Sequence, residues 1–133
     1  GTGYWAALLA ARGADILAYD AQPGRNWWCD ADMYHPVETA TWRAVGRHAD
    51  RALFLCWPPM SQMASRTLEM YGTAGGQRVA YIGELDCGCC ADDKFFWVLE
   101  RDWDEVAAVD IPQWWGLHDG LWIYERKKAA IGS

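Results

Sequence analysis

The chain has 133 residues, of which 52% are apolar, and its formal net charge is −6. A chain of this length is near the commonest domain size and can bury a core, so we predict a single domain over residues 1–133. The acidic balance and the lack of a basic run disfavour nucleic acid as a partner, because basic side chains supply most of the binding to a phosphate backbone. No apolar stretch approaches the ~20 residues of a membrane span, and no signal-peptide pattern opens the chain, so no membrane partner is expected.

The cysteines and tryptophans are unusual for a chain of this size. The five cysteines are an odd number, and three of them crowd together at Cys87, Cys89 and Cys90. This distribution does not fit a disulfide framework and favours a reducing, cytoplasmic location. Two tryptophan pairs, Trp27-Trp28 and Trp114-Trp115, fall in expected loops. Exposed aromatic side chains there would mark a ligand pocket or a partner surface, and the alternative is that they close over the sheet edges.

Taken in chain order, the first twenty residues read as half of a nucleotide-binding unit. Gly1 and Gly3 allow a tight turn that comes close to a ligand, since neither has a Cβ atom. An apolar helix over 5–12 follows, and then a short buried strand over 15–19. Asp20, at the carboxyl end of that strand, is placed to accept hydrogen bonds from ribose hydroxyls. The alternative is a structural turn that leads into a core helix.

A glycine turn of this type follows a strand, and none precedes Gly1. We therefore expect an N-terminally truncated sheet that lacks its first strand. The strands that carry Asp20 and Trp57 would then pair with each other or with a segment of another chain. An unpaired central edge promotes association, so a homodimer is predicted.

Beyond a loop that begins after Asp20, helical and strand patterns alternate along the chain. This alternation predicts an α/β fold with a mostly parallel sheet and helices on both faces. No helix separates the last two strands, so we predict that they form a C-terminal antiparallel pair. The expected elements are an edge strand over 34–37, a helix over 39–47, a strand over 51–57, a helix over 61–71, a strand over 77–83, a helix over 91–101, and strands over 103–111 and 121–126.

A resemblance to a known family rests on three stretches: GTGYWAALLAARGAD…AYD, CWPP and IPQWWGLHDGLWIYER. With them, the chain resembles a class I S-adenosylmethionine-dependent methyltransferase domain over nearly its whole length. More closely, it is similar to a group of little-characterised bacterial and fungal methyltransferase-like proteins. The resemblance implies a Rossmann-like fold, S-adenosylmethionine as the cofactor and a small-molecule substrate. The cofactor would be held by the glycine turn and by the acid after the second strand of the family's fold: Gly1, Thr2, Gly3, Tyr4 and Asp20.

The resemblance also implies a catalytic loop at Trp57, Pro58 and Pro59, which occupy the place of the family's (Asp/Asn)-Pro-Pro-aromatic motif. In amino-methylating members, the polar first residue helps to grip the target nitrogen. Here that residue is Trp57, which has one hydrogen-bond donor and no acceptor. This departure disfavours methylation of a base or amide nitrogen. An aromatic site does suit a positive sulfonium, through cation–π contact.

Three further residues are expected to bind substrate from loops at the functional edge of the sheet: His35, Glu84 and His118. His118 with Asp119 is a candidate base with an orienting carboxylate. Adjacent residues on a strand or turn tend to point apart, so a solvated turn is the favoured alternative. No metal site is expected, because the C-x-x-C of Cys87 and Cys90 lacks a second pair of ligands.

These observations leave three hypotheses. The first is a small cytoplasmic methyltransferase of unknown substrate. The second is a binding or interaction protein that keeps the fold but has lost catalysis, which the missing strand and the altered motifs favour. The third is thiol redox chemistry through Cys87 and Cys90. It is the least favoured, because one unpaired C-x-x-C is a weak signal.

Overall fold

The computed structural model describes residues 1–85 and 88–129. The chain forms two compact units, Gly1–Ala44 and Val45–Ser133. The prediction of a single domain over residues 1–133 stays a prediction. Within the described residues, no helix is both long and apolar enough to cross a membrane.

The first unit contains a short helix and a two-stranded parallel sheet. α1 (Tyr4–Ala10) starts directly after Gly3, whose φ of 75° lies in the left-handed region that glycine adopts without strain. Gly13, with a φ of 90°, follows the end of the helix as predicted. β1 (Tyr19–Asp20) pairs in parallel with β2 (Glu38–Thr39).

Both strands of this unit are shorter than predicted. The strand expected over 15–19 is reduced to Tyr19–Asp20, and the edge strand expected over 34–37 lies at Glu38–Thr39. Pro36 has no N–H group to donate to a ladder, so the pairing begins only beyond it. The first bond of the ladder runs from the N–H of Glu38 to the carbonyl of Ala18, at 2.9 Å.

A 3₁₀ helix, η1 (Trp42–Arg47), stands where an α-helix was predicted over 39–47. Its hydrogen bonds span three residues, as in the 3.1 Å bond from the N–H of Ala44 to the carbonyl of Thr41. Gly46 lowers the α-helical propensity of this short segment, which explains the tighter helix.

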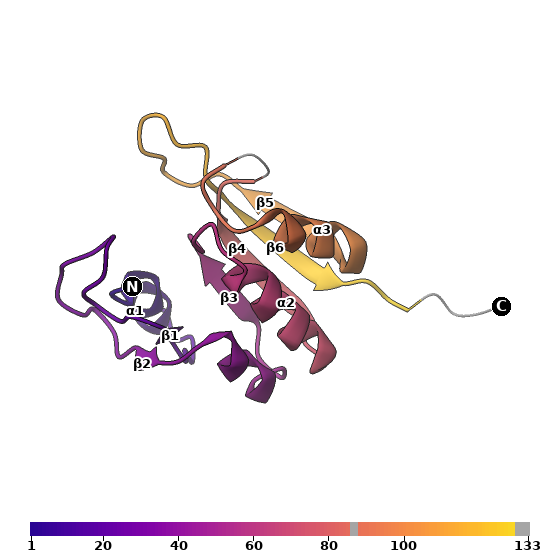
Figure 1. The fold of residues 1–133 in the computed structure, drawn as a ribbon, viewed down its shortest axis with the longest axis horizontal. Coiled ribbons are helices and arrows are strands. Elements are labelled where there is room, and N and C mark those ends of the chain that lie inside the picture. Colours follow the sequence, from indigo (N-terminus) through magenta and orange to yellow (C-terminus); the bar gives the residue numbers. More distant parts are fainter. Residues whose placement is uncertain (86–87, 130–133) are drawn as a thin grey trace. The chain divides into compact units, whose positions relative to one another are not determined.

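The second unit is built on a four-stranded sheet with two helices (Figure 1). The strands lie in the order β3-β4-β6-β5. Each element is within a few residues of its predicted position. The elements are β3 (Leu53–Cys56), α2 (Met63–Thr73), β4 (Arg78–Gly83), α3 (Asp93–Asp102), β5 (Trp103–Val109) and β6 (Gly120–Arg126).

This sheet is mixed and mostly antiparallel, so the prediction of a mostly parallel sheet is wrong. Only β3 and β4 are parallel, whereas β6 runs antiparallel to both β4 and β5. The predicted C-terminal antiparallel pair is confirmed as β5 and β6. The sequence pattern did not reveal that β6 enters between β4 and β5, and this insertion gives the unit its second antiparallel ladder.

Both helices of the second unit lie on the same face of its sheet, side by side (Figure 1). The prediction of helices on both faces is not met within this unit. Alternate residues of β3 and β4 point towards the helices and join one buried cluster. The members of the cluster are Leu53, Leu55, Ala64, Leu68, Tyr71, Val79, Tyr81, Cys90, Ala91, Phe95, Val98, Leu99, Trp103 and Tyr124.

The hydroxyl of Tyr71, in α2, ties the beginnings of β3 and β4 to the helix. It lies 2.8 Å from the carbonyl oxygen of Arg51 and 2.9 Å from that of Arg78, and it can donate to either. It also accepts from the N–H groups of Gln77 at 3.2 Å and Arg78 at 3.1 Å. Gly76 lies directly against the ring of Tyr71. A buried phenol thus provides hydrogen-bond partners for backbone groups at the beginnings of both strands.

Four tryptophans of the predicted loops are exposed: Trp27, Trp28, Trp114 and Trp115. Trp115 is 101% exposed and Trp27 is 90% exposed, so neither packs over a sheet edge. The use of these residues for a ligand or a partner stays a prediction.

Candidate functional site

The predicted cofactor residues lie together in the first unit. The carboxylate of Asp20 contacts the backbone nitrogen of Gly1. The other carboxylate oxygen accepts a hydrogen bond of 2.7 Å from the N–H of Gln22. The side chain of Asp20 is 34% exposed, so hydroxyl groups of a ligand can reach it from solvent.

The turn before α1 packs against the backbone around His35. The carbonyl of Thr2 accepts a hydrogen bond of 2.8 Å from the N–H of Tyr34. A Cβ atom on Gly3 would come within 2.9 Å of the carbonyl oxygen of His35, which only a glycine avoids. The rings of Tyr4 and Tyr34 meet edge to face, with centroids 5.5 Å apart. The glycine turn and His35 therefore form one continuous surface of this unit.

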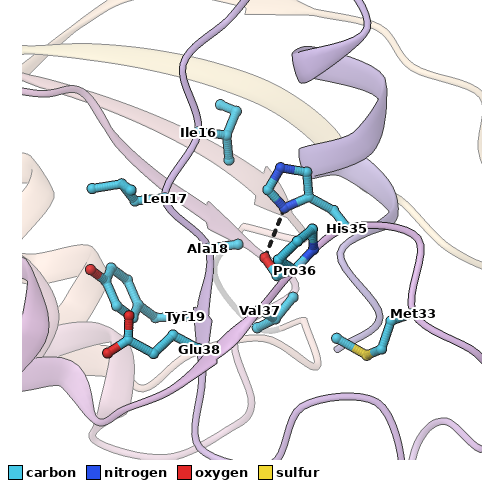
Figure 2. Close-up of a pocket in the computed structure, with 9 residues that line it drawn as sticks. All are labelled: Ile16, Leu17, Ala18, Tyr19, Met33, His35, Pro36, Val37 and Glu38. Atoms are coloured by element: carbon cyan, nitrogen blue, oxygen red, sulfur yellow. Dashed lines mark hydrogen bonds between the residues drawn. The ribbon is translucent and has the colours of Figure 1, made fainter.

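An open cavity of about 630 Å³ lies beside the two segments that lead into β1 and β2 (Figure 2). His35 is the predicted site residue among those that line it. Its Nδ1 lies 2.8 Å from the carbonyl oxygen of Pro36, which can only accept, so Nδ1 carries a proton. The walls are mainly apolar and are formed by Ile16, Leu17, Ala18, Tyr19, Met33, His35, Pro36, Val37 and Glu38.

The predicted catalytic loop follows β3 directly, in the second unit. Trp57 has a φ of 49°, a conformation that is uncommon for a residue with a Cβ atom. Its N–H donates to the carbonyl of Ile82 at 2.7 Å and extends the pairing of β3 with β4. The carbonyl of Pro58 accepts from the N–H of Ala91 at 3.0 Å. Pro58 is buried and Pro59 is exposed, so the loop is anchored on one side and open to solvent on the other.

The indole of Trp57 is tied to Asp119, 62 positions later in the sequence. Its Nε1 donates to Oδ2 of Asp119 at 3.3 Å. The side-chain amide of Gln113 donates to the backbone carbonyl of Asp119 at 2.6 Å. His118 is exposed, whereas Asp119 is only 8% exposed. The solvated turn that was the favoured alternative therefore holds for His118 but not for Asp119, whose carboxylate bonds to Trp57.

Glu84 lies at the same edge of the sheet as Trp57 and Asp119. Gly83 pairs with Gly120, so Glu84 and Asp119 are the next residues outward on their two strands. The backbone carbonyl of Glu84 accepts a hydrogen bond of 2.6 Å from the hydroxyl of Tyr81. Burial, together with the neighbouring Cys90, raises the pKa of Tyr81, so the hydroxyl remains a donor.

The thiol of Cys56, next to Trp57, is held in its neutral form. Burial raises its pKa to about 12, and the neighbouring Cys90 and Asp119 add to the rise. Since the folded chain keeps a proton that the unfolded chain releases above about pH 9, this group makes stability fall as the pH rises from there towards 12.

We expect iodoacetamide at pH 8 to leave Cys56 unmodified in the native protein. A thiol with a pKa of about 12 is a thiolate in about one molecule in ten thousand at pH 8, and the thiolate is the form that reacts. Peptide mass spectrometry before and after unfolding in urea measures the difference. Labelling of native Cys56 as fast as that of the exposed Cys89 would contradict this expectation.

The cysteines of the described residues are free thiols: Cys29, Cys56, Cys89 and Cys90. Cys87, and with it the C-x-x-C, lies outside the described residues. Over residues 1–85 and 88–129, no three His, Cys, Asp or Glu side chains come together as metal ligands.

The predicted site residues fall into one group in each unit. The prediction missed the role of Asp119 as the partner of Trp57, because it considered that acid only with His118. A signal was present: an indole N–H in a loop held against a sheet needs an acceptor, and Asp119 is an acid directly before β6. The first group holds Gly1, Thr2, Gly3, Tyr4, Asp20 and His35, and the second holds Trp57, Pro58, Pro59, Glu84 and His118.

Comparison with known proteins gives no family for this chain. The sequence matches no family model, and neither a curated protein nor a solved structure matches it significantly.

Proposed function

We propose that the chain is a class I S-adenosylmethionine-dependent methyltransferase-like protein with a Rossmann-like fold, acting on a small molecule in the cytoplasm. One structural observation supports the proposal beyond the sequence resemblance. On the first unit, the carboxylate of Asp20 contacts the nitrogen of Gly1, 19 positions earlier, where the expected glycine turn begins. The antiparallel pair of β5 and β6 also agrees with the resemblance.

The chemistry of methyl transfer suits residues of these types. A methyl group leaving a sulfonium needs a nucleophile held close and in line, with little acid–base assistance. In the first unit, Asp20 would accept hydrogen bonds from the ribose hydroxyls of S-adenosylmethionine. The backbone of the glycine turn would approach the cofactor closely, and His35 would border the ligand from the adjoining cavity.

Calorimetric titration with S-adenosylmethionine and S-adenosylhomocysteine tests the proposal. We expect saturable binding that Asp20→Ala weakens at least about tenfold, because each hydrogen bond to a charged acceptor contributes about 1.5–3 kcal/mol. Asp32→Ala is the matched control, since it removes an exposed acid of the same unit, and it should leave the affinity unchanged. Absence of binding at millimolar ligand, or equal affinity in the Asp20→Ala variant, would overturn the proposal.

A second candidate function is ligand binding without catalysis. The indole N–H of Trp57 is engaged by Asp119, and an indole has no acceptor, so this side chain offers no polar group to a nucleophile. Cofactor binding without formation of S-adenosylhomocysteine, across primary amines, thiols and carboxylates as acceptors, would support this candidate. The homodimer stays a prediction, which light scattering on the full chain would decide.

A further inference from the structure

The buried carboxylate of Asp119 lacks a full set of partners. The residue is 8% exposed, and its Oδ2 accepts the indole N–H of Trp57 at 3.3 Å. Its Oδ1 is buried, and no donor from residues 1–85 or 88–129 reaches it. Nor does any Lys, Arg or His of those residues form an ion pair with Asp119. A buried carboxylate with an unfilled oxygen and no counter-charge is strongly unfavourable, so Asp119 favours a partner that brings N–H donors and positive charge.

The surroundings of Asp119 add acceptors and an aromatic ring. Glu84 occupies the facing position at the same edge of the sheet, and its side chain already accepts from the thiol of Cys89 at 3.6 Å. The thiol of Cys56 is neutral, because its pKa is raised to about 12. Trp57 is partly buried, and its ring packs against the edge of the core. The site therefore has negative charge and a π surface, which together favour a cation that carries N–H groups.

We propose that Asp119 and Trp57 form a binding site for an organic ammonium ion. An N–H of the ammonium donates to Oδ1 of Asp119, and the indole ring of Trp57 faces the positive charge. Because Oδ1 is buried, this binding requires a side chain to give way, and the indole of Trp57 is the nearest candidate, since its bond to Oδ2 is long at 3.3 Å. The site belongs to the second unit alone and does not require S-adenosylmethionine.

Titration followed by nitrogen-15 NMR tests this site in the full chain. The protein is labelled at its ten tryptophans, and the indole resonance of Trp57 is the one that is lost in Trp57→Phe. The probes are n-butylammonium, tetramethylammonium, which has the charge but no N–H, and n-butanol, which has a hydroxyl but no charge. We expect n-butylammonium to shift the Trp57 resonance saturably, and the other two probes to bind at least about tenfold more weakly.

Two variants locate the response. Asp119→Asn keeps the shape of the side chain but removes its charge, and should weaken n-butylammonium binding at least about tenfold. Asp110→Asn changes an exposed acid of the same β5–β6 connection and should leave the binding unchanged. Equal binding of all three probes, equal binding by Asp119→Asn, or no saturable shift with n-butylammonium would overturn the proposal. If Asp119→Asn does not fold, the comparison of the three probes on the unmodified chain decides alone.

The test of the ammonium site and the test of the proposed methyltransferase function can succeed or fail independently. Binding of n-butylammonium by a protein that does not bind S-adenosylmethionine leaves the ammonium site standing and removes the methyltransferase proposal. Cofactor binding without any response to n-butylammonium does the reverse. A water molecule as the sole occupant beside Oδ1, in a crystal grown with n-butylammonium, would also overturn the ammonium site.

Discussion

Gly76→Ala is expected to lower the free energy of unfolding by about 3 kcal/mol. A Cβ atom at this position would overlap three ring atoms of Tyr71. The ring cannot step aside, because its hydroxyl is bonded at the starts of β3 and β4, and its face stacks on Trp103 with centroids 5.8 Å apart. The backbone at Gly76 is not in the left-handed region, so the cost arises from overpacking rather than from φ. Urea unfolding followed by circular dichroism measures it.

A double-mutant cycle with Tyr71→Leu controls for other effects of the new methyl group. Leucine lacks the ring atoms that the Cβ atom would meet, so Gly76→Ala should cost less than about 1 kcal/mol in that background. A cost that is the same in both backgrounds would show that the ring of Tyr71 is not the obstacle.

Phe95→Ala is expected to cost about 3–5 kcal/mol, which is a large part of the stability of a typical domain. Phe95 is fully buried in α3, and its ring lies 5.2 Å from each of the rings of Tyr81 and Phe96. Removing the ring opens a cavity at the centre of the cluster that joins both helices to the sheet. Calorimetric unfolding gives the loss, and Phe95→Leu provides a milder variant if the alanine variant does not fold.

Trp97→Ala is the matched control on the same helix. Trp97 is 54% exposed, and its main partner is the guanidinium of Arg101, 4.5 Å from the ring centroid. An exposed cation–π contact contributes about 0.5–1 kcal/mol, so this larger side chain should cost far less than Phe95. Equal losses from the two variants would mean that burial in the cluster does not set the stability of the second unit.

The sequence predicted the positions of the elements well where local signals are strong. Pro58-Pro59 ends the strand that contains Leu53–Cys56, and Gly75-Gly76 separates α2 from β4, so these boundaries fall within a few residues of the expected ones. Whether neighbouring strands run parallel or antiparallel is not set by such local signals. It depends on β6 pairing with β4, an association between distant segments that no local pattern encodes.

For the same reason, the short-range part of the candidate site was predicted from the sequence and the long-range part was missed. The glycine turn and Asp20 are joined by one helix and one strand, so their convergence follows from short-range geometry. The bond from Trp57 to Asp119 spans 62 positions and depends on the insertion of β6. Chemistry could have indicated it, because an indole donor requires an acceptor, but many acids were available as candidates.

The place of β6 in the sheet also sets the order in which the second unit can assemble. Among the strands of the described residues, β6 is the last in sequence, yet it is an interior strand of the sheet and lies between β4 and β5. During synthesis, the local helices can form early, but the sheet cannot close until residues 120–126 have emerged. Until then, β4 exposes an unpaired edge and β5 has no strand beside it. Of these four strands, β6 is made last and completes the sheet, so a chain that stops before Gly120 is left with an open edge prone to aggregation.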